Sequence, residues 1–123
     1  MTSQGRPSSA EPTIARIWRG RVVPGNADAY ERYLLAEGIP PLRKTALAVQ
    51  LFREDRATET EFVTTSYWPD IPAMSEFTGG DPNVVHHLPR DAEFLIELPQ
   101  RIEVLRIIVN TLPWQATRTG ARP

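Results

Sequence analysis

The sequence contains no cysteine and only two histidines, which are adjacent at positions 86 and 87. The lack of cysteine excludes a disulfide, a thiolate nucleophile and a cysteine-ligated metal. Acidic and basic residues nearly cancel, at a formal net charge of -1, so no overall charge favours nucleic acid. No apolar run approaches the roughly 18 residues of a membrane-spanning helix. Nucleotide-binding glycine motifs and the Gly-x-Ser-x-Gly elbow are also absent, so neither nucleotide cofactors nor serine hydrolysis is indicated.

Length and composition indicate one ordinary globular domain. The chain has 123 residues, of which 41% are hydrophobic and 24% charged. We expect residues 1–12 to form a flexible N-terminal tail, residues 13–112 the folded domain and residues 113–123 a C-terminal tail. The N-terminus lacks the apolar core of a secretory signal, so we expect a cytoplasmic protein.

Alternating side chains predict four strands, at residues 13–23, 46–53, 61–68 and 102–110. The polar residues between the second and third strands are typical of a hairpin connection.

Three helices are expected between these strands. The first would begin with a capping box of Asp28 and Glu31 and end at Gly38, because two prolines follow. The second would be capped by Asp70, and a short third helix is expected over residues 90–98. The resulting order, β-α-β-β-α-(α)-β, is the split β-α-β arrangement of an α+β, ferredoxin-like fold with a four-stranded antiparallel sheet.

Both faces of this sheet carry apolar residues. One layer of helices covers a single face, and a second copy of the chain would cover the other. The sequence therefore predicts a homodimer. The last strand shows the pattern, with Ile102, Val104 and Ile108 facing one way and Leu105, Ile107 and Val109 the other.

The chain resembles the antibiotic biosynthesis monooxygenase family in three segments, ARIWRGRVVPGNADAYERYL, TEFVTTSYWPDIPAMSEFTG and DAEFLIEL followed by a strand. The resemblance covers residues 14–109 and implies a dimeric α/β barrel. It also implies a range of activities, since members include cofactor-independent oxygenases of polyketide and other aromatic substrates and haem-handling relatives. Fold alone does not decide among these.

The resemblance further implies a substrate pocket between the helices and the sheet. Trp68 matches the family tryptophan at the end of the third strand, and Phe62, Thr64 and Ser66 would share its face by alternation. Phe77 would close the pocket from the helix side.

Two residues of the first strand, Arg16 and Trp18, are further candidates for substrate binding, although alternation cannot fix the relative phase of two strands. Arg16 would either steer an anionic substrate or pair with Glu61 or Glu103. Each tryptophan could instead belong to the core. For Trp68 a pocket wall is favoured, because small hydroxyl residues beside it leave room for a ligand.

The histidine pair is the candidate catalytic group. Adjacent side chains point to opposite sides of a strand, or about 100° apart on a helix, so His86 and His87 do not suit one metal ion. Haem needs one axial histidine and is a minor alternative to the expectation of no cofactor. An unperturbed imidazole titrates near pH ~6.5 and can remove a phenolic or enolic proton. His87 is preferred because it adjoins Leu88-Pro89, which we expect to fold toward the core; alternatively, both histidines are merely exposed.

The sequence thus predicts a small homodimeric enzyme that acts on an apolar aromatic or polyketide-like metabolite. Its most specific form is cofactor-independent oxygenation, in which a histidine base forms the substrate anion and that anion gives an electron to O₂. One alternative is a non-oxidative cyclase or isomerase in the same pocket. Another is a dimer that binds a small molecule without catalysis.

Overall fold

A computed structural model describes residues 11–113. Both predicted tails lie almost entirely outside this range. The elements in chain order are β1 (Ile14–Val22), a 3-10 turn (Pro24–Asn26), α1 (Ala27–Tyr33), a π-helical turn (Leu34–Gly38), α2 (Ile39–Thr45), β2 (Ala48–Asp55), β3 (Thr60–Trp68), α3 (Ile71–Thr78), α4 (Asp91–Phe94) and β4 (Glu103–Arg106).

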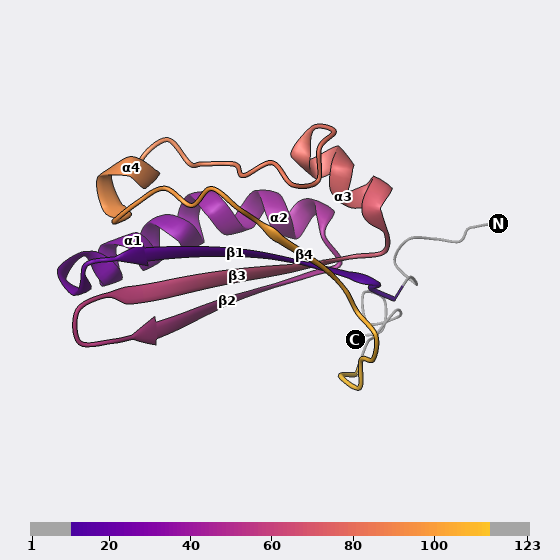
Figure 1. The fold of residues 1–123 in the computed structure, drawn as a ribbon, viewed down its shortest axis with the longest axis horizontal. Helices are drawn as coiled ribbons and strands as arrows, with labels where there is room; N and C mark the ends of the chain where they lie inside the picture. The colour runs from indigo at the N-terminus through magenta and orange to yellow at the C-terminus, as the bar shows by residue number, and fades with distance from the viewer. Residues whose placement is uncertain (1–10, 114–123) are drawn as a thin grey trace.

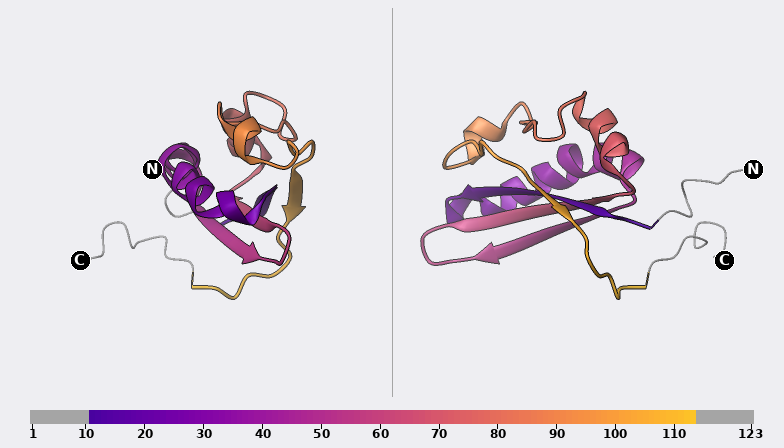
Figure 2. Two further views of the ribbon diagram at one scale, coloured as in Figure 1. Left: turned by 90° about the vertical axis from the view of Figure 1, so that its left-hand side faces the viewer. Right: turned by 45° about the vertical axis from the view of Figure 1, so that its right-hand side comes forward.

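The strands form one antiparallel sheet in the order β2-β3-β1-β4, which confirms the predicted α+β class (Figure 1). The helices lie on one face of this sheet, and in two further views the other face carries no helix from the described part of the chain (Figure 2). Among residues 11–113, no helix is both long and apolar enough to cross a bilayer.

The register of β1 against β3 fixes the relative phase that alternation leaves open. Arg16 pairs with Ser66, and Trp18 pairs with Thr64. These four side chains share the face that the helices cover, and all four are buried. The helix-covered face therefore carries the substrate-binding candidates of β1 and those of β3.

The first helical segment continues through its prolines, so the predicted end at Gly38 is wrong. Gly38 keeps a right-handed backbone, and Pro40 and Pro41 occupy the start of α2. Prolines lack the N–H that an α-helix needs, and widening residues 34–38 into a π-helical turn accommodates that loss.

The predicted capping box is also wrong. Asn26 caps α1 without a side-chain hydrogen bond. Asp28 and Glu31 instead form ion pairs with Arg53 of β2, at 2.9 and 2.8 Å. Because Arg53 pairs with both carboxylates, neither of them caps the helix terminus.

The second half of the chain matches the predictions in part. Asp70 caps α3 by accepting a hydrogen bond from the Ala73 backbone N–H at 2.8 Å, as predicted. The predicted helix at residues 90–98 is only one turn, because Leu95 leaves it to form an antiparallel bridge with Val22.

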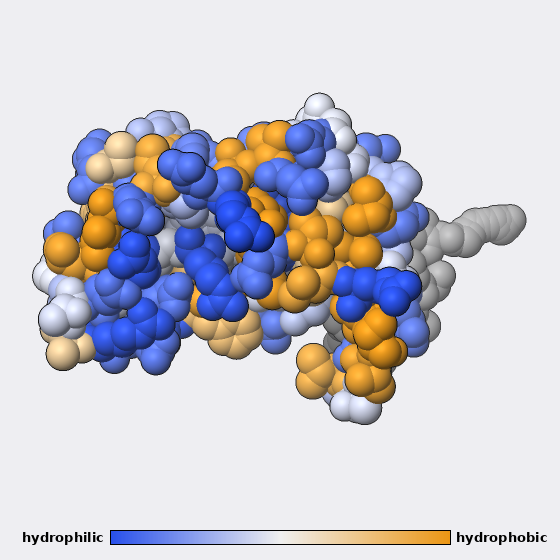
Figure 3. All heavy atoms as spheres, in the orientation of Figure 1, coloured by the Kyte–Doolittle hydropathy of each residue, from blue (hydrophilic) through white to orange (hydrophobic). Residues whose placement is uncertain are grey.

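The last strand is shorter than predicted and ends at Arg106. Ile102 is buried on the helix side, whereas Ile108 is 78% exposed, so the predicted shared face of Ile102 and Ile108 is wrong. Figure 1 shows the chain leaving the sheet after β4 on the side away from the helices. Apolar side chains gather on that segment in the space-filling view (Figure 3).

Two apolar clusters fill the space between helices and sheet. The first centres on Trp18, Tyr30 and Phe62, and the second on Trp68 and Met74. The two clusters stand at opposite ends of the same strands. Between them, the inward positions of β1 and β3 carry Arg16, Thr64 and Ser66.

Candidate functional site

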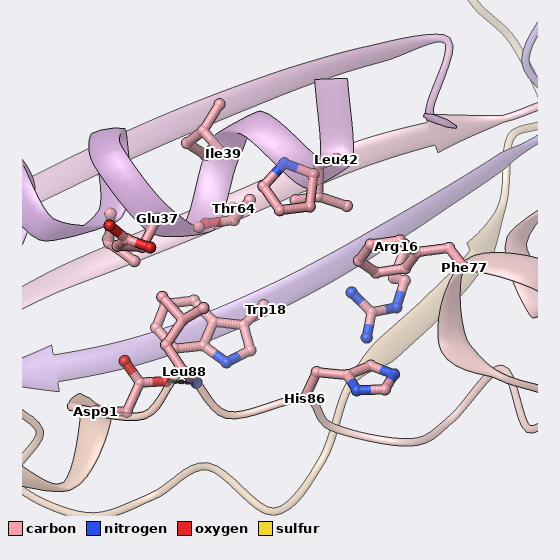
Figure 4. A pocket seen from close by; sticks show the side chains of 13 residues that line it. Arg16, Trp18, Glu37, Ile39, Leu42, Thr64, Phe77, His86, Leu88 and Asp91 are labelled. Atoms are coloured by element: carbon pink, nitrogen blue, oxygen red, sulfur yellow. Dashed lines mark hydrogen bonds between the residues drawn. The ribbon is translucent and has the colours of Figure 1, made fainter. Parts of the chain in front are cut away.

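A cavity of about 280 Å³ opens where the two apolar clusters meet. Members of both clusters line it, and its floor is the central part of the sheet (Figure 4). The lining residues are Arg16, Trp18, Leu34, Glu37, Gly38, Ile39, Pro41, Leu42, Thr64, Phe77, His86, Leu88 and Asp91.

The helix side of the cavity is built by the π-helical turn and the start of α2. This wall is tightly packed around Gly38, because a Cβ added at that position would lie 3.2 Å from Leu88 Cδ1 and 3.4 Å from Leu34 Cδ2. Segments of π-helix often occur at functional sites. Here the wider turn and the following prolines shape one wall of the cavity.

Trp18 is held as a cavity wall by the glycine two residues further along β1. The indole lies over Gly20, where an added Cβ would collide with the ring and would approach Leu95 Cδ2 to 3.0 Å. Because residues 18 and 20 share one face of the strand, the missing side chain gives the indole its place.

Arg16 is the cation of the cavity. Its guanidinium points toward the loop that carries His86 (Figure 4) and lies 5.6 Å from the centre of the Phe77 ring. One terminal nitrogen donates a hydrogen bond to the Val84 carbonyl at 3.0 Å. Burial lowers the pKa of Arg16 from its usual value. The predicted pairing with Glu61 or Glu103 is wrong, because those carboxylates pair with Arg56 and Arg19.

His86 lines the cavity, next to Arg16 and Phe77. Its ring centre lies 5.9 Å from that of Phe77, and its Nε2 lies 3.0 Å from the Thr78 carbonyl oxygen. A carbonyl only accepts hydrogen bonds, so this contact assigns the proton to Nε2. In the neutral ring, Nδ1 then carries the lone pair that can take a proton.

His87 lies in a different hollow, beside Asp81, Asn83 and Leu98. The sequence-based preference for His87 over His86 therefore does not agree with the placement of the two rings. The turn after α3 directs the first imidazole toward the cavity and the second away from it.

Asp91 places a buried carboxylate at the far end of the cavity from Arg16 (Figure 4). It accepts hydrogen bonds from the Tyr30 hydroxyl at 2.9 Å and from the Leu88 backbone N–H at 2.8 Å. Burial and the nearby carboxylate raise the pKa of Tyr30 well above its usual value, so its hydroxyl stays a donor. Asp91 thereby ties α1 to the cavity loop.

The cavity gathers four of the seven predicted substrate-binding residues, Arg16, Trp18, Thr64 and Phe77. The other three, Phe62, Ser66 and Trp68, are almost completely buried and do not line it. Trp68 is fully buried, and its Nε1–H donates to Ser66 Oγ at 3.0 Å.

Sequence reasoning missed the helix-side wall. The signal was present, because two prolines within an amphipathic helix indicate a distorted turn. Within the described range, no group of three or more histidine, aspartate or glutamate side chains is arranged to hold a metal ion.

Two solved structures share this fold. A Bacillus cereus protein described as a candidate antibiotic biosynthesis monooxygenase gives a TM-score of 0.59 at 12% identity, covering 84% of this chain and 100% of that one. A Pseudomonas aeruginosa protein gives a TM-score of 0.53 at 19% identity, covering 84% and 96%. No family model and no curated protein matches the sequence. The likeness shows a common fold and agrees with the resemblance seen in the sequence.

Proposed function

We propose that the chain is a small homodimeric enzyme that oxygenates an apolar aromatic or polyketide-like metabolite without a bound cofactor, with His86 as the general base. The observation that carries this proposal is the imidazole of His86 beside the guanidinium of Arg16 at one end of a largely apolar cavity. A base and a cation together can form and hold a substrate anion. We also propose that the protein is cytoplasmic.

The proposed reaction needs no external reductant. His86 Nδ1 removes the proton of a phenol, and the phenolate gives one electron to O₂. The resulting radical pair combines into a peroxide anion on a ring carbon, the protonated imidazole returns its proton to give the hydroperoxide, and loss of water leaves a quinone. One oxygen atom enters the product and the other leaves as water, while the substrate supplies all four electrons. The protein's own part is removal and return of this proton and stabilisation of the anion.

The Bacillus cereus protein of the same fold is described as a candidate antibiotic biosynthesis monooxygenase, and that description supports the proposed reaction class. Haem, the minor alternative, does not fit the residues present. A cavity of about 280 Å³ does not enclose a four-pyrrole macrocycle, and His86 Nε2 is engaged by the Thr78 carbonyl.

Replacing His86 with alanine is expected to slow oxidation of 1-naphthol to naphthoquinone by roughly 100- to 10,000-fold, the usual contribution of a general base. The measurement is O₂ consumption under air. His87→Ala is the matched control, because that ring lies outside the cavity, and it should keep most of the activity.

Unchanged turnover in His86→Ala would reject the base assignment. Consumption of the substrate under strict anaerobiosis would favour the cyclase or isomerase alternative. Tight binding of 1-naphthol with no turnover in either condition would favour a binding dimer.

The homodimer is proposed from the uncovered face of the sheet. Ala15 and Leu105 pair on that face, and Leu105 is 48% exposed. The exposed Ile108, Val109 and Leu112 follow on the segment that leaves the sheet on the same side (Figure 1). A second copy would cover these apolar side chains and leave the helix-side cavity open.

Leu105→Glu is expected to weaken self-association at least tenfold, because it places a charge in the proposed interface. Sedimentation at several concentrations measures the effect. Val23→Glu is the control, since Val23 is similarly exposed, at 46%, but lies beyond the end of β1. A monomer mass that does not change with concentration in the unmodified protein would remove the dimer proposal.

A further inference from the structure

Arg16 is a buried cation with an incomplete set of partners. The residue is 5% exposed, its Nε is buried, and among residues 11–113 that nitrogen has no hydrogen-bond partner. Its guanidinium makes one hydrogen bond, to a neutral backbone carbonyl, and one ring contact, with Phe77. Buried polar groups in native proteins nearly always have partners, so an exception at a cavity wall needs an explanation.

No carboxylate of residues 11–113 lies within ion-pair distance of Arg16. The two other carboxylates at the cavity do not neutralise it. Glu37 is exposed at the rim, and both oxygens of Asp91 already accept hydrogen bonds from Tyr30 and Leu88. Five arginines nearer the outer surface differ, since Arg19, Arg21, Arg53, Arg56 and Arg90 pair with carboxylates. The exposed Arg32, Arg43, Arg101 and Arg106 remain accessible to water.

An uncompensated buried charge destabilises the folded state, since neither water nor a counter-ion replaces its lost hydration. A neutral side chain of similar length, such as methionine, would pack in the same place without that penalty. Retaining a guanidinium here is explained if the missing anion arrives with a ligand.

We propose that the cavity binds its ligand as an oxyanion. The negatively charged oxygen of the ligand would contact the Arg16 guanidinium, and one or two aromatic rings would lie between Trp18 and Leu42. This inference rests on the cavity assigned in the proposed function and names the substrate class. The anion is either a permanent aromatic carboxylate or a phenolate formed in the site. An apolar cavity of about 150 Å³ is enough for benzene, so about 280 Å³ suits one or two rings rather than a large polycycle.

The test is equilibrium binding under nitrogen, where no oxygenation occurs. We expect 2-naphthoate to bind the unmodified protein roughly 10- to 100-fold more tightly than the neutral 2-naphthamide, as for a hydrogen-bonded charged group. Calorimetry measures both affinities. Arg16→Met should abolish the preference. Arg19→Met is the matched control, because Arg19 lies on the opposite face of the same strand, is half exposed and should leave the preference unchanged.

Thermal unfolding and a second variant separate the effect on folding from the effect of charge. Arg16→Met should unfold at a temperature equal to or higher than that of the unmodified protein, because it removes an unpaired buried cation. Arg16→Lys keeps the charge and should keep part of the preference for 2-naphthoate. A merely structural Arg16 would instead give destabilised variants whose preference between the two ligands does not change.

A chromogenic phenol distinguishes the two sources of the anion. 4-Nitrophenol is yellow only when ionised, so a rise in absorbance on adding protein reports binding as the phenolate. A rise that disappears in Arg16→Met supports the phenolate source; a preference for 2-naphthoate without that rise supports the carboxylate source.

Equal binding of 2-naphthoate and 2-naphthamide together with no rise for 4-nitrophenol overturns the inference, as does a preference that survives in Arg16→Met. These outcomes are independent of turnover. Oxygenation of 1-naphthol can fail while the oxyanion preference holds, and it can succeed while the preference is absent.

Discussion

Replacing Trp68 with alanine is expected to lower the free energy of unfolding by roughly 3–5 kcal/mol. The side chain is fully buried, packs 5.6 Å from the Phe77 ring between centres and belongs to one of the two core clusters. A domain of this size has about 5–15 kcal/mol in total, so the variant would be close to unfolding. Urea denaturation followed by circular dichroism measures the loss.

The control is Ser66→Ala, which removes only the acceptor of the Trp68 Nε1–H bond. It should cost about 1–3 kcal/mol, the usual penalty for an unsatisfied buried group. If Trp68→Ala instead changed stability by less than about 1 kcal/mol and weakened binding of 2-naphthoate, the tryptophan would be a pocket wall after all.

The two tryptophans show where sequence reasoning stops. Alternation grouped Trp68 with Ser66 on one strand and Trp18 with Arg16 on another, because side chains of a strand alternate strictly, but only the register shows that the two groups share one face. It could not say which indole borders empty space, since that depends on the helix packed above. The π-helical turn leaves room over Trp18 and Thr64, whereas Met74 and Leu42 close the space over Trp68.

The strand pattern was predictable because it is local. Strand positions, the hairpin and the Asp70 cap were all predicted from spacing along the chain. The capping box failed because Arg53, on another strand, competes for Asp28 and Glu31. The same limit applied to Arg16, whose expected carboxylate partners belong to other arginines in the folded protein.

The cavity left a trace on two strands of the sequence, and only the hydroxyl residues of the third strand entered the predicted pocket. On β1 the inward residues are Ile14, Arg16 and Trp18, and on β3 a pair of small hydroxyl residues stands between Phe62 and Trp68. Each strand thus interrupts its apolar face at the same level of the sheet. An interruption shared by paired strands favours a cavity over a continuous core, but only the register reveals that the two coincide.

Replacing Asp91 with alanine is expected to lower the free energy of unfolding by about 2–6 kcal/mol. The carboxylate is 2% exposed and satisfies the buried Tyr30 hydroxyl and the Leu88 N–H. Its removal leaves both donors unpaired, at roughly 1–3 kcal/mol each. Urea denaturation gives the value, and Glu93→Ala is the control, because that neighbouring carboxylate forms only an exposed pair with Arg90 and should change stability by less than about 0.5 kcal/mol.

Asp91→Asn separates the hydrogen bonds from the charge. The amide oxygen can still accept from Tyr30, but the amide nitrogen cannot accept from the Leu88 N–H, so about half of the loss should remain. Because Leu88 lines the cavity, a detached loop would also loosen one wall and weaken binding of 2-naphthoate and 2-naphthamide alike. A loss confined to 2-naphthoate would contradict this, since Asp91 would then act on the ligand's charge rather than on the position of the loop.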